Sequence, residues 1–162
     1  MRQLWAPWRM AYLQSNKQAA DGGCLFCRKI EADDAEEQIL YRGRHCYITL
    51  NRYPYNTGHL LIVPYHHTDR LEALGAEAAA ELVHLTQASL RILEEVYHPQ
   101  GFNMGINQGR AAGAGVAEHL HLHIVPRWQG DANYMTTIAE TRVMPETLEQ
   151  TYARLLPHFR TL

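Results

Sequence analysis

Runs of β-branched, aliphatic and aromatic residues in the middle of the chain alternate with turn residues, a pattern that predicts several short strands. Residues 38–41 and 45–50 have this character and flank Arg42-Gly43-Arg44, a plausible hairpin turn. Residues 59–63 form a short apolar run that stops at Pro64. Two more strands are expected over residues 102–107 and 119–125, the second ending at Pro126.

Two segments carry apolar residues at steps of three and four, which is typical of amphipathic helices. The first begins near Glu77, after a possible cap at Thr68-Asp69, and ends before Pro99. The second can begin at Pro145. The predicted core positions are Leu82, Leu85, Ser89, Ile92 and Val96, then Leu148, Tyr152, Leu155 and Leu156. The order of elements predicts an α+β fold: a mainly antiparallel sheet, one long helix packed on it, and a C-terminal helix.

Composition places the chain among ordinary globular proteins. With 162 residues, 46% hydrophobic and 20% charged, it is expected to form a single domain over residues 1–162, including an N-terminal arm (1–23) and a C-terminal extension (129–162). Trp5, Trp8 and Tyr12 are the expected anchors of the arm. A net charge of −2 gives no global field toward nucleic acid or an anionic membrane. No apolar window is long enough for a membrane span or an export signal, so a cytoplasmic location is expected.

The densest chemistry lies in residues 119–125, where His119, His121 and His123 alternate with apolar residues. On a strand this alternation puts the imidazoles on one face, about 6.5 Å apart. They could ligate a catalytic metal, as in a metallohydrolase, or a neutral imidazole could attack phosphorus. The glycine-rich loop over residues 109–115 favours the second chemistry, because its exposed backbone amides could cradle a phosphate.

Cys24 and Cys27 form a C-x-x-C motif, which suggests either a redox pair or half of a metal site. Zinc would need two further nitrogen or sulfur donors, which His66 or His67 and one histidine of residues 119–123 could supply. A redox pair is the weaker interpretation, because the βαβ setting of such motifs is missing. The isolated Cys46 fits a small buried side chain.

The segment from His119 to Val125, joined to residues 51–59 and to Val63-Pro64, resembles the signature of the histidine triad superfamily of nucleotidyl hydrolases and transferases. Residues 4–13, 107–115 and 126–128 are similar to the bacterial diadenosine tetraphosphate phosphorylase branch of that superfamily. The resemblance covers nearly the whole chain. It implies a histidine-triad-like fold and a homodimer or larger homo-oligomer.

The resemblance also implies roles for individual residues. His121 would be the nucleophile, His123 would contact the phosphate, and His59 would lie close to it. Asn51 matches the position whose side chain binds the ribose hydroxyls. The matching zinc ligands are Cys24, Cys27, His67 and His119, so His119 would belong to both the triad and a closed structural zinc site.

The chain departs from the family pattern just before the triad. Many members carry Gly-Gln-Ser or Gly-Gln-Thr there, whereas this chain has Ala114-Gly115-Val116. Backbone amides of Gly113, Gly115 and Val116 would have to replace the missing side chains. Asn107 and Gln108 are the nearest polar residues that could add phosphate contacts.

These features together predict an enzyme that cleaves a dinucleoside polyphosphate, with diadenosine tetraphosphate as the first candidate, through a nucleotidylated His121. The acceptor would be inorganic phosphate or water, and no organic cofactor is needed. A nucleoside phosphoramidate hydrolase and a metallohydrolase are the alternative enzymes. A nucleotide-binding regulatory module without turnover is the alternative outside enzymes.

Overall fold

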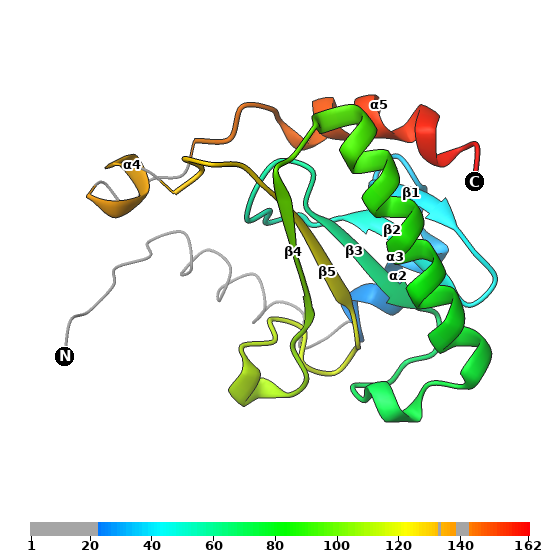
Figure 1. The fold of residues 1–162 in the computed structure, drawn as a ribbon. Helices are drawn as coiled ribbons and strands as arrows, with labels where there is room; N and C mark the ends of the chain where they lie inside the picture. The colour runs from blue at the N-terminus through cyan, green and yellow to red at the C-terminus, as the bar shows by residue number, and fades with distance from the viewer. Residues whose placement is uncertain (1–22, 133, 139–142) are drawn as a thin grey trace.

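The computed structural model describes residues 23–132, 134–138 and 143–162, in which five strands form one antiparallel sheet of order β1-β2-β3-β5-β4 (Figure 1). The strands are β1 (Ile39–Arg42), β2 (Cys46–Leu50), β3 (Leu60–Pro64), β4 (Gly101–Ile106) and β5 (Leu122–Arg127). The helices are α2 (Leu25–Glu31), α3 (Ala76–Tyr97), α4 (Tyr134–Thr137) and α5 (Leu148–Phe159), with short 3-10 turns η2 (Leu71–Ala73) and η3 (Arg110–Ala112). The α+β prediction is confirmed. Trp5, Trp8 and Tyr12 of the expected arm lie outside the described residues.

Helices pack on both faces of the sheet, and residues 103–105 of the edge strand β4 are exposed. In Figure 1, α3 crosses one face and α2 lies behind the strands. On the α3 side, alternate strand residues such as Ile48, Ile62 and Ile124 join Leu93 of α3 and Leu155 of α5 in the larger core. The smaller core lies under α2 and consists of Phe26, Ile39, Tyr47, Leu61 and Val63. His123 pairs with Leu61 across β3 and β5, so the histidine shares the α2 face.

The histidine segment is less regular than the sequence predicted. β5 begins at Leu122, so only His123 lies within the strand, and Leu120 instead donates its backbone N–H to the Thr68 carbonyl. The strand also continues through Pro126 to Arg127. β3 pairs with β5 only as far as Ile124, and beyond it the Pro126 carbonyl accepts from the Asn56 side chain. In a strand, the N–H and C=O of one residue point to the same side. The N–H that Pro126 lacks would therefore point to the side where β3 no longer pairs with β5, and the sheet loses no hydrogen bond.

The helix boundaries also differ from the prediction. Gly75, and not Thr68-Asp69, precedes α3, because η2 occupies the intervening residues. The seven-residue helix α2 was not expected at all: Cys24 caps it without a side-chain hydrogen bond, so the usual start signal is missing. α5 begins at Leu148 behind a capping box formed by Thr147 and Gln150.

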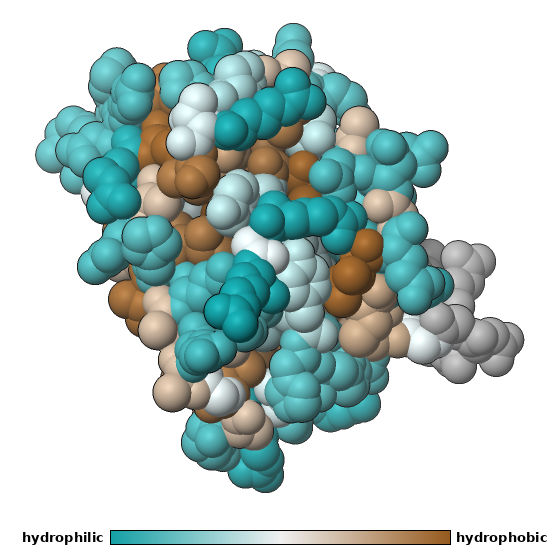
Figure 2. Space-filling model, turned by 90° about the vertical axis from the view of Figure 1, so that its right-hand side faces the viewer, coloured by the Kyte–Doolittle hydropathy of each residue, from teal (hydrophilic) through white to brown (hydrophobic). Residues whose placement is uncertain are grey.

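Figure 2 shows a face on which hydrophilic residues predominate and hydrophobic residues appear in smaller areas between them. Within the described ranges, no helix combines the length and apolar character that crossing a membrane requires.

Glu81 of α3 ties the helix to the hairpin between β1 and β2. Its carboxylate accepts the backbone N–H groups of Arg44, His45 and Cys46. The same carboxylate approaches to 2.5 Å from where a Cβ on Gly43 would lie. Glycine at position 43 therefore leaves the space that this contact needs.

We expect Glu81→Ala to lower the free energy of unfolding by about 2 kcal/mol, because three amide donors lose a charged acceptor. Urea denaturation measures the change. Glu94→Ala, at an exposed position of the same helix, is the matched control and should stay within about 0.5 kcal/mol of the parent. Equal effects of the two substitutions would show that the contact contributes nothing.

Candidate active site

Four potential metal ligands meet where α2 approaches the histidine segment. Ligand atoms of Cys24, Cys27, His67 and His119 all lie within 4.8 Å of one another. His119 Nδ1 is 3.2 Å from Cys24 Sγ and 3.6 Å from Cys27 Sγ, and His67 Nδ1 is 3.3 Å from Cys27 Sγ. Ordinary Zn–S and Zn–N bonds at a tetrahedral angle separate sulfur and nitrogen by about 3.6 Å. The donor set and its spacing therefore fit zinc.

The ring of His119 is already oriented for ligation. Its Nε2 donates to the Pro64 carbonyl at 2.8 Å, and a carbonyl can only accept, so the proton sits on Nε2. Nδ1 then carries the lone pair and faces the two sulfur atoms. Burial lowers the pKa of His119, which also favours the neutral ring.

Cys27 is a poor thiolate nucleophile in its own right. Partial burial and the neighbouring Cys24 thiol raise the pKa of Cys27 to about 11. Redox chemistry needs a thiolate, which this environment disfavours, whereas a bound cation would ionise the thiol directly.

His121 is held in one tautomer beside this cluster. Its Nδ1 donates to the His119 carbonyl at 2.8 Å, so a neutral ring carries its lone pair on Nε2. The side chain is buried, and burial lowers its pKa. The ring centroid is 4.9 Å from that of Phe26 and 4.8 Å from that of His123. A neutral, oriented imidazole of this kind can act as a nucleophile.

A chain of hydrogen bonds fixes the next two histidines. The backbone N–H of Tyr55 donates to His59 Nδ1 at 3.0 Å, so the His59 proton sits on Nε2. His59 Nε2 lies 2.9 Å from His123 Nδ1 and donates to it. The remaining proton of His123 is therefore on Nε2, where it can serve as a hydrogen-bond donor or acid toward a bound anion.

Asn51 completes this group. Its side-chain nitrogen lies 3.3 Å from His59 Nδ1, and its side-chain oxygen accepts the Tyr53 backbone N–H. The Tyr55 ring stacks near His123, with centroids 5.8 Å apart and an interplanar angle of 17°. The structure thus brings together three residues that the sequence had assigned to one site, namely Asn51, His59 and His123.

The structure connects the loop before the triad less clearly to the histidines. Val116 packs against the smaller core, and Gly113 ends η3 in a left-handed conformation. Asn107 is half-buried directly after β4, and Gly115 is exposed. Gln108 is engaged elsewhere: its side chain accepts from the Leu71 backbone and donates to Glu72. A cavity of about 280 Å³ beside this loop is lined by Asp69, Gly109, Arg110, Ala117 and Glu118, none of them a triad histidine.

Sequence reasoning missed two residues of the site, Phe26 and Tyr55. Phe26 packs on the rings of both His119 and His121, and Tyr55 supplies the N–H that orients His59. An apolar residue between two metal-binding cysteines could have indicated the first. No sequence signal indicates the second, because its role depends on the path of a loop.

The comparisons with known proteins agree with this geometry. The HIT domain model matches residues 32–130, which is more than half of the chain. The chain therefore belongs to the HIT domain family, as the resemblance of its motifs predicted. The prediction of an enzyme of this family is confirmed by a relative of 41% identity, the AP-4-A phosphorylase of Mycobacterium tuberculosis.

A named enzyme and two solved structures are similar to the chain. It is 41% identical over 157 residues to AP-4-A phosphorylase of Mycobacterium tuberculosis, covering 93% of this chain and 80% of that one. A crystal structure of a Zn-bound histidine triad family protein from Mycobacterium smegmatis aligns with a TM-score of 0.69 and 29% identity, over 86% of this chain and 94% of the other. A uridylyltransferase structure shares the fold at 23% identity, with a TM-score of 0.70, over 98% of this chain and 52% of that one.

The pKa of His123 makes stability depend on pH. Burial, and then the neighbouring His121, lower it from 6.5 to about 4. Between these two pH values, His123 is protonated in the unfolded chain and neutral in the folded chain. The free energy of unfolding therefore falls as the pH falls from about 6.5 to about 4. We expect His123→Asn to make this fall shallower in urea denaturation at stepped pH. His84→Asn, on the exposed face of α3, is the control, and identical slopes for the His123 variant and the parent would contradict the prediction.

Proposed function

We propose that the chain cleaves dinucleoside polyphosphates, diadenosine tetraphosphate first among them, through a covalent nucleotidyl-His121 intermediate. The observation that carries the proposal is the hydrogen bond from His121 Nδ1 to the His119 carbonyl, which leaves the lone pair of Nε2 for phosphorus. The 41% identity to an enzyme named AP-4-A phosphorylase supports this choice of substrate.

The reaction proceeds in two displacements. His121 Nε2 attacks the α-phosphorus, the P–O bond to the remaining nucleotide breaks, and ATP leaves. We propose that the Nε2 proton of His123 is donated to the departing oxygen. Phosphate or water then attacks the same phosphorus, the P–N bond to His121 breaks, and ADP or AMP is released. With phosphate as acceptor the overall products are ADP and ATP.

The other site residues would bind and orient the nucleotide. Asn51, beside His59, is proposed to bind the ribose hydroxyls, and backbone amides of Gly113, Gly115 and Val116 to contact the phosphates. Asn107, which follows β4 directly, would add a polar contact. Gln108 would first have to release Leu71 and Glu72.

We also propose that Cys24, Cys27, His67 and His119 hold a structural zinc ion. Bound zinc would supply a cross-link between α2 and the histidine segment, with all four of its positions taken by the protein. His121 and His123 lie outside this ligand set, which argues against the metallohydrolase alternative.

Metal analysis tests the zinc site. We expect about one zinc per chain, and we expect Cys27→Ser to lose the metal and lower the melting temperature by about 10 °C, as the loss of a tightly bound ligand does in a domain of this size. His66→Ala is the matched control, because His66 is the exposed neighbour of His67 and lies outside the cluster. Retention of zinc by Cys27→Ser, or its loss from His66→Ala, would contradict the assignment.

Product analysis tests the reaction. Diadenosine tetraphosphate should give ADP and ATP when phosphate is present, and His121→Ala should abolish turnover while nucleotide binding remains measurable. His84→Ala is the control and should keep full activity. AMP and ATP without phosphate would make water the acceptor. Turnover by His121→Ala would refute the nucleophile, and turnover of phosphoramidates alone would favour the alternative hydrolase.

Four expectations from the sequence stay predictions: a single domain over residues 1–162, a homodimer or larger homo-oligomer, a cytoplasmic location, and no nucleic-acid or membrane partner. Light scattering coupled to size-exclusion chromatography measures the oligomeric state directly.

A further inference from the structure

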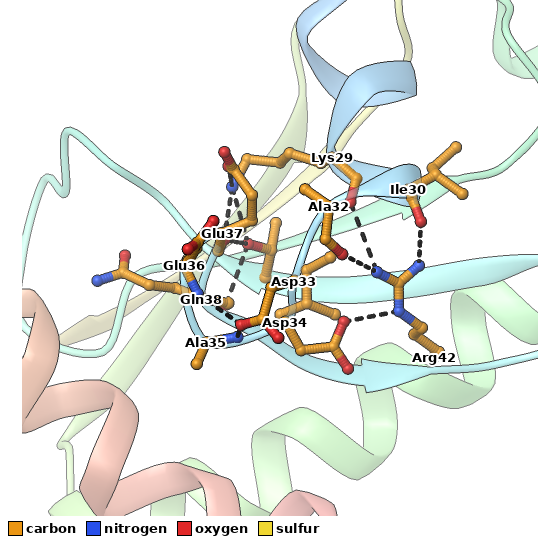
Figure 3. A network of polar contacts seen from close by, with 12 residues as sticks. Lys29, Ile30, Ala32, Asp33, Asp34, Ala35, Glu36, Glu37, Gln38 and Arg42 are labelled. Carbon is orange, nitrogen blue, oxygen red and sulfur yellow. Dashed lines mark hydrogen bonds and ion pairs between the residues drawn. The ribbon is translucent and has the colours of Figure 1, made fainter.

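Helix α2 is fastened at both ends. At its start, Cys24 and Cys27 belong to the four-residue metal cluster. At its end, the Arg42 guanidinium of β1 donates to the carbonyls of Ile30 at 2.9 Å and Ala32 at 3.3 Å, and it pairs with Asp34 at 2.7 Å (Figure 3). Such a short helix has little stability of its own, so these contacts determine where it lies.

Lys29 adds a second tie at the same end. Its ammonium donates to the Glu37 carbonyl at 2.7 Å and lies 3.0 Å from the Glu37 carboxylate (Figure 3). It also reaches the Thr49 hydroxyl of β2 at 3.3 Å. The side chain is almost fully buried. Lys29 therefore anchors the end of the helix to Glu37 and to the sheet.

Phe26 lies between these two anchors and projects onto the histidines. The side chain is 3% exposed, and the Phe26 carbonyl accepts the Tyr47 hydroxyl at 3.0 Å. Its ring is 5.5 Å from His119 in an edge-on arrangement and 4.9 Å from His121. One aromatic side chain thus contacts both a metal ligand and the nucleophile.

A single hydrogen bond cannot fix the direction of an imidazole. The bond from His121 Nδ1 to the His119 carbonyl sets which nitrogen faces outward, but it lets the ring tilt about the N–H···O line. Packing against Phe26 and His123 restricts that tilt. Misplacing a reacting atom by about 1 Å can slow a reaction about 100-fold, so this restriction matters for attack.

We propose that Phe26 is a positioning residue, which sets the direction of His121 Nε2, and that metal ligation by Cys24 and Cys27 keeps its ring in place. The proposal rests on the proposed function. It gives the cluster a kinetic role besides its structural one, since loosening the start of α2 would withdraw the ring from the nucleophile.

The experiment compares Phe26→Leu and Phe26→Ala with the parent in three measurements on the metal-loaded protein: zinc content, nucleotide dissociation constant, and the single-turnover rate of adduct formation on His121. We expect Phe26→Ala to slow adduct formation about 10- to 100-fold and Phe26→Leu by less. The dissociation constant should change less than twofold, and one zinc per chain should remain. Phe102→Leu, which removes a half-buried ring from the larger core, is the control and should leave the rate unchanged.

A second arm tests the link to the metal. Stripping zinc from the parent with a chelator should slow adduct formation. Stripping it from Phe26→Leu should slow adduct formation by a smaller factor, because this variant has already lost part of the packing on His121 that the metal maintains. Equal factors in the two proteins would overturn the link.

The outcomes separate the possible errors. An unchanged rate of adduct formation in both Phe26 variants would overturn the positioning role. Weaker nucleotide binding with an unchanged rate would also overturn it, because Phe26 would then be a nucleotide contact. Absence of any adduct in the parent would instead refute the proposed function itself.

Discussion

The hydrogen bond between the His121 ring and the His119 carbonyl is the constraint on which the site depends. It gives a neutral His121 one tautomer, with the lone pair on Nε2, the nitrogen that we propose attacks phosphorus. The residue that supplies the carbonyl has its own side chain in the metal cluster, where the Pro64 carbonyl orients it in the same manner. Backbone acceptors thus determine the chemistry of two successive histidines, with opposite nitrogens presented in the two rings.

The irregular start of β5 makes this arrangement possible. If the strand began at His119, the carbonyls of residues 119–121 would pair with neighbouring strands. Because it begins at Leu122, the His119 carbonyl accepts from the ring two residues later, and Leu120 bonds to Thr68. His123, inside the strand, is fixed instead by a side-chain partner, His59. The triad therefore combines a loop-like segment with a strand: backbone carbonyls orient His119 and His121, and a side chain orients His123.

The sequence predicted the parts of this account that short-range patterns control. Alternation located the sheet and the histidine segment, and helical periodicity located the inward face of α3. The spacing of Cys24 and Cys27 indicated either a redox pair or half of a metal site. The family resemblance also brought distant residues together correctly, Cys24 with His119 and His59 with His123, but contacts outside its motifs were not predicted. Glu81 on the hairpin, Tyr55 on His59 and Phe26 on His121 each depend on two segments meeting in space, and α2 carries no capping signal.

The most direct test of the account is the tautomer of His121, which long-range proton–nitrogen NMR correlations of the imidazole rings report in the free protein at neutral pH. We expect a neutral His121 ring with the proton on Nδ1 and a lone pair on Nε2. A neutral ring with the proton on Nε2, or a charged ring with protons on both nitrogens, would leave no nucleophilic nitrogen toward the substrate and would contradict it.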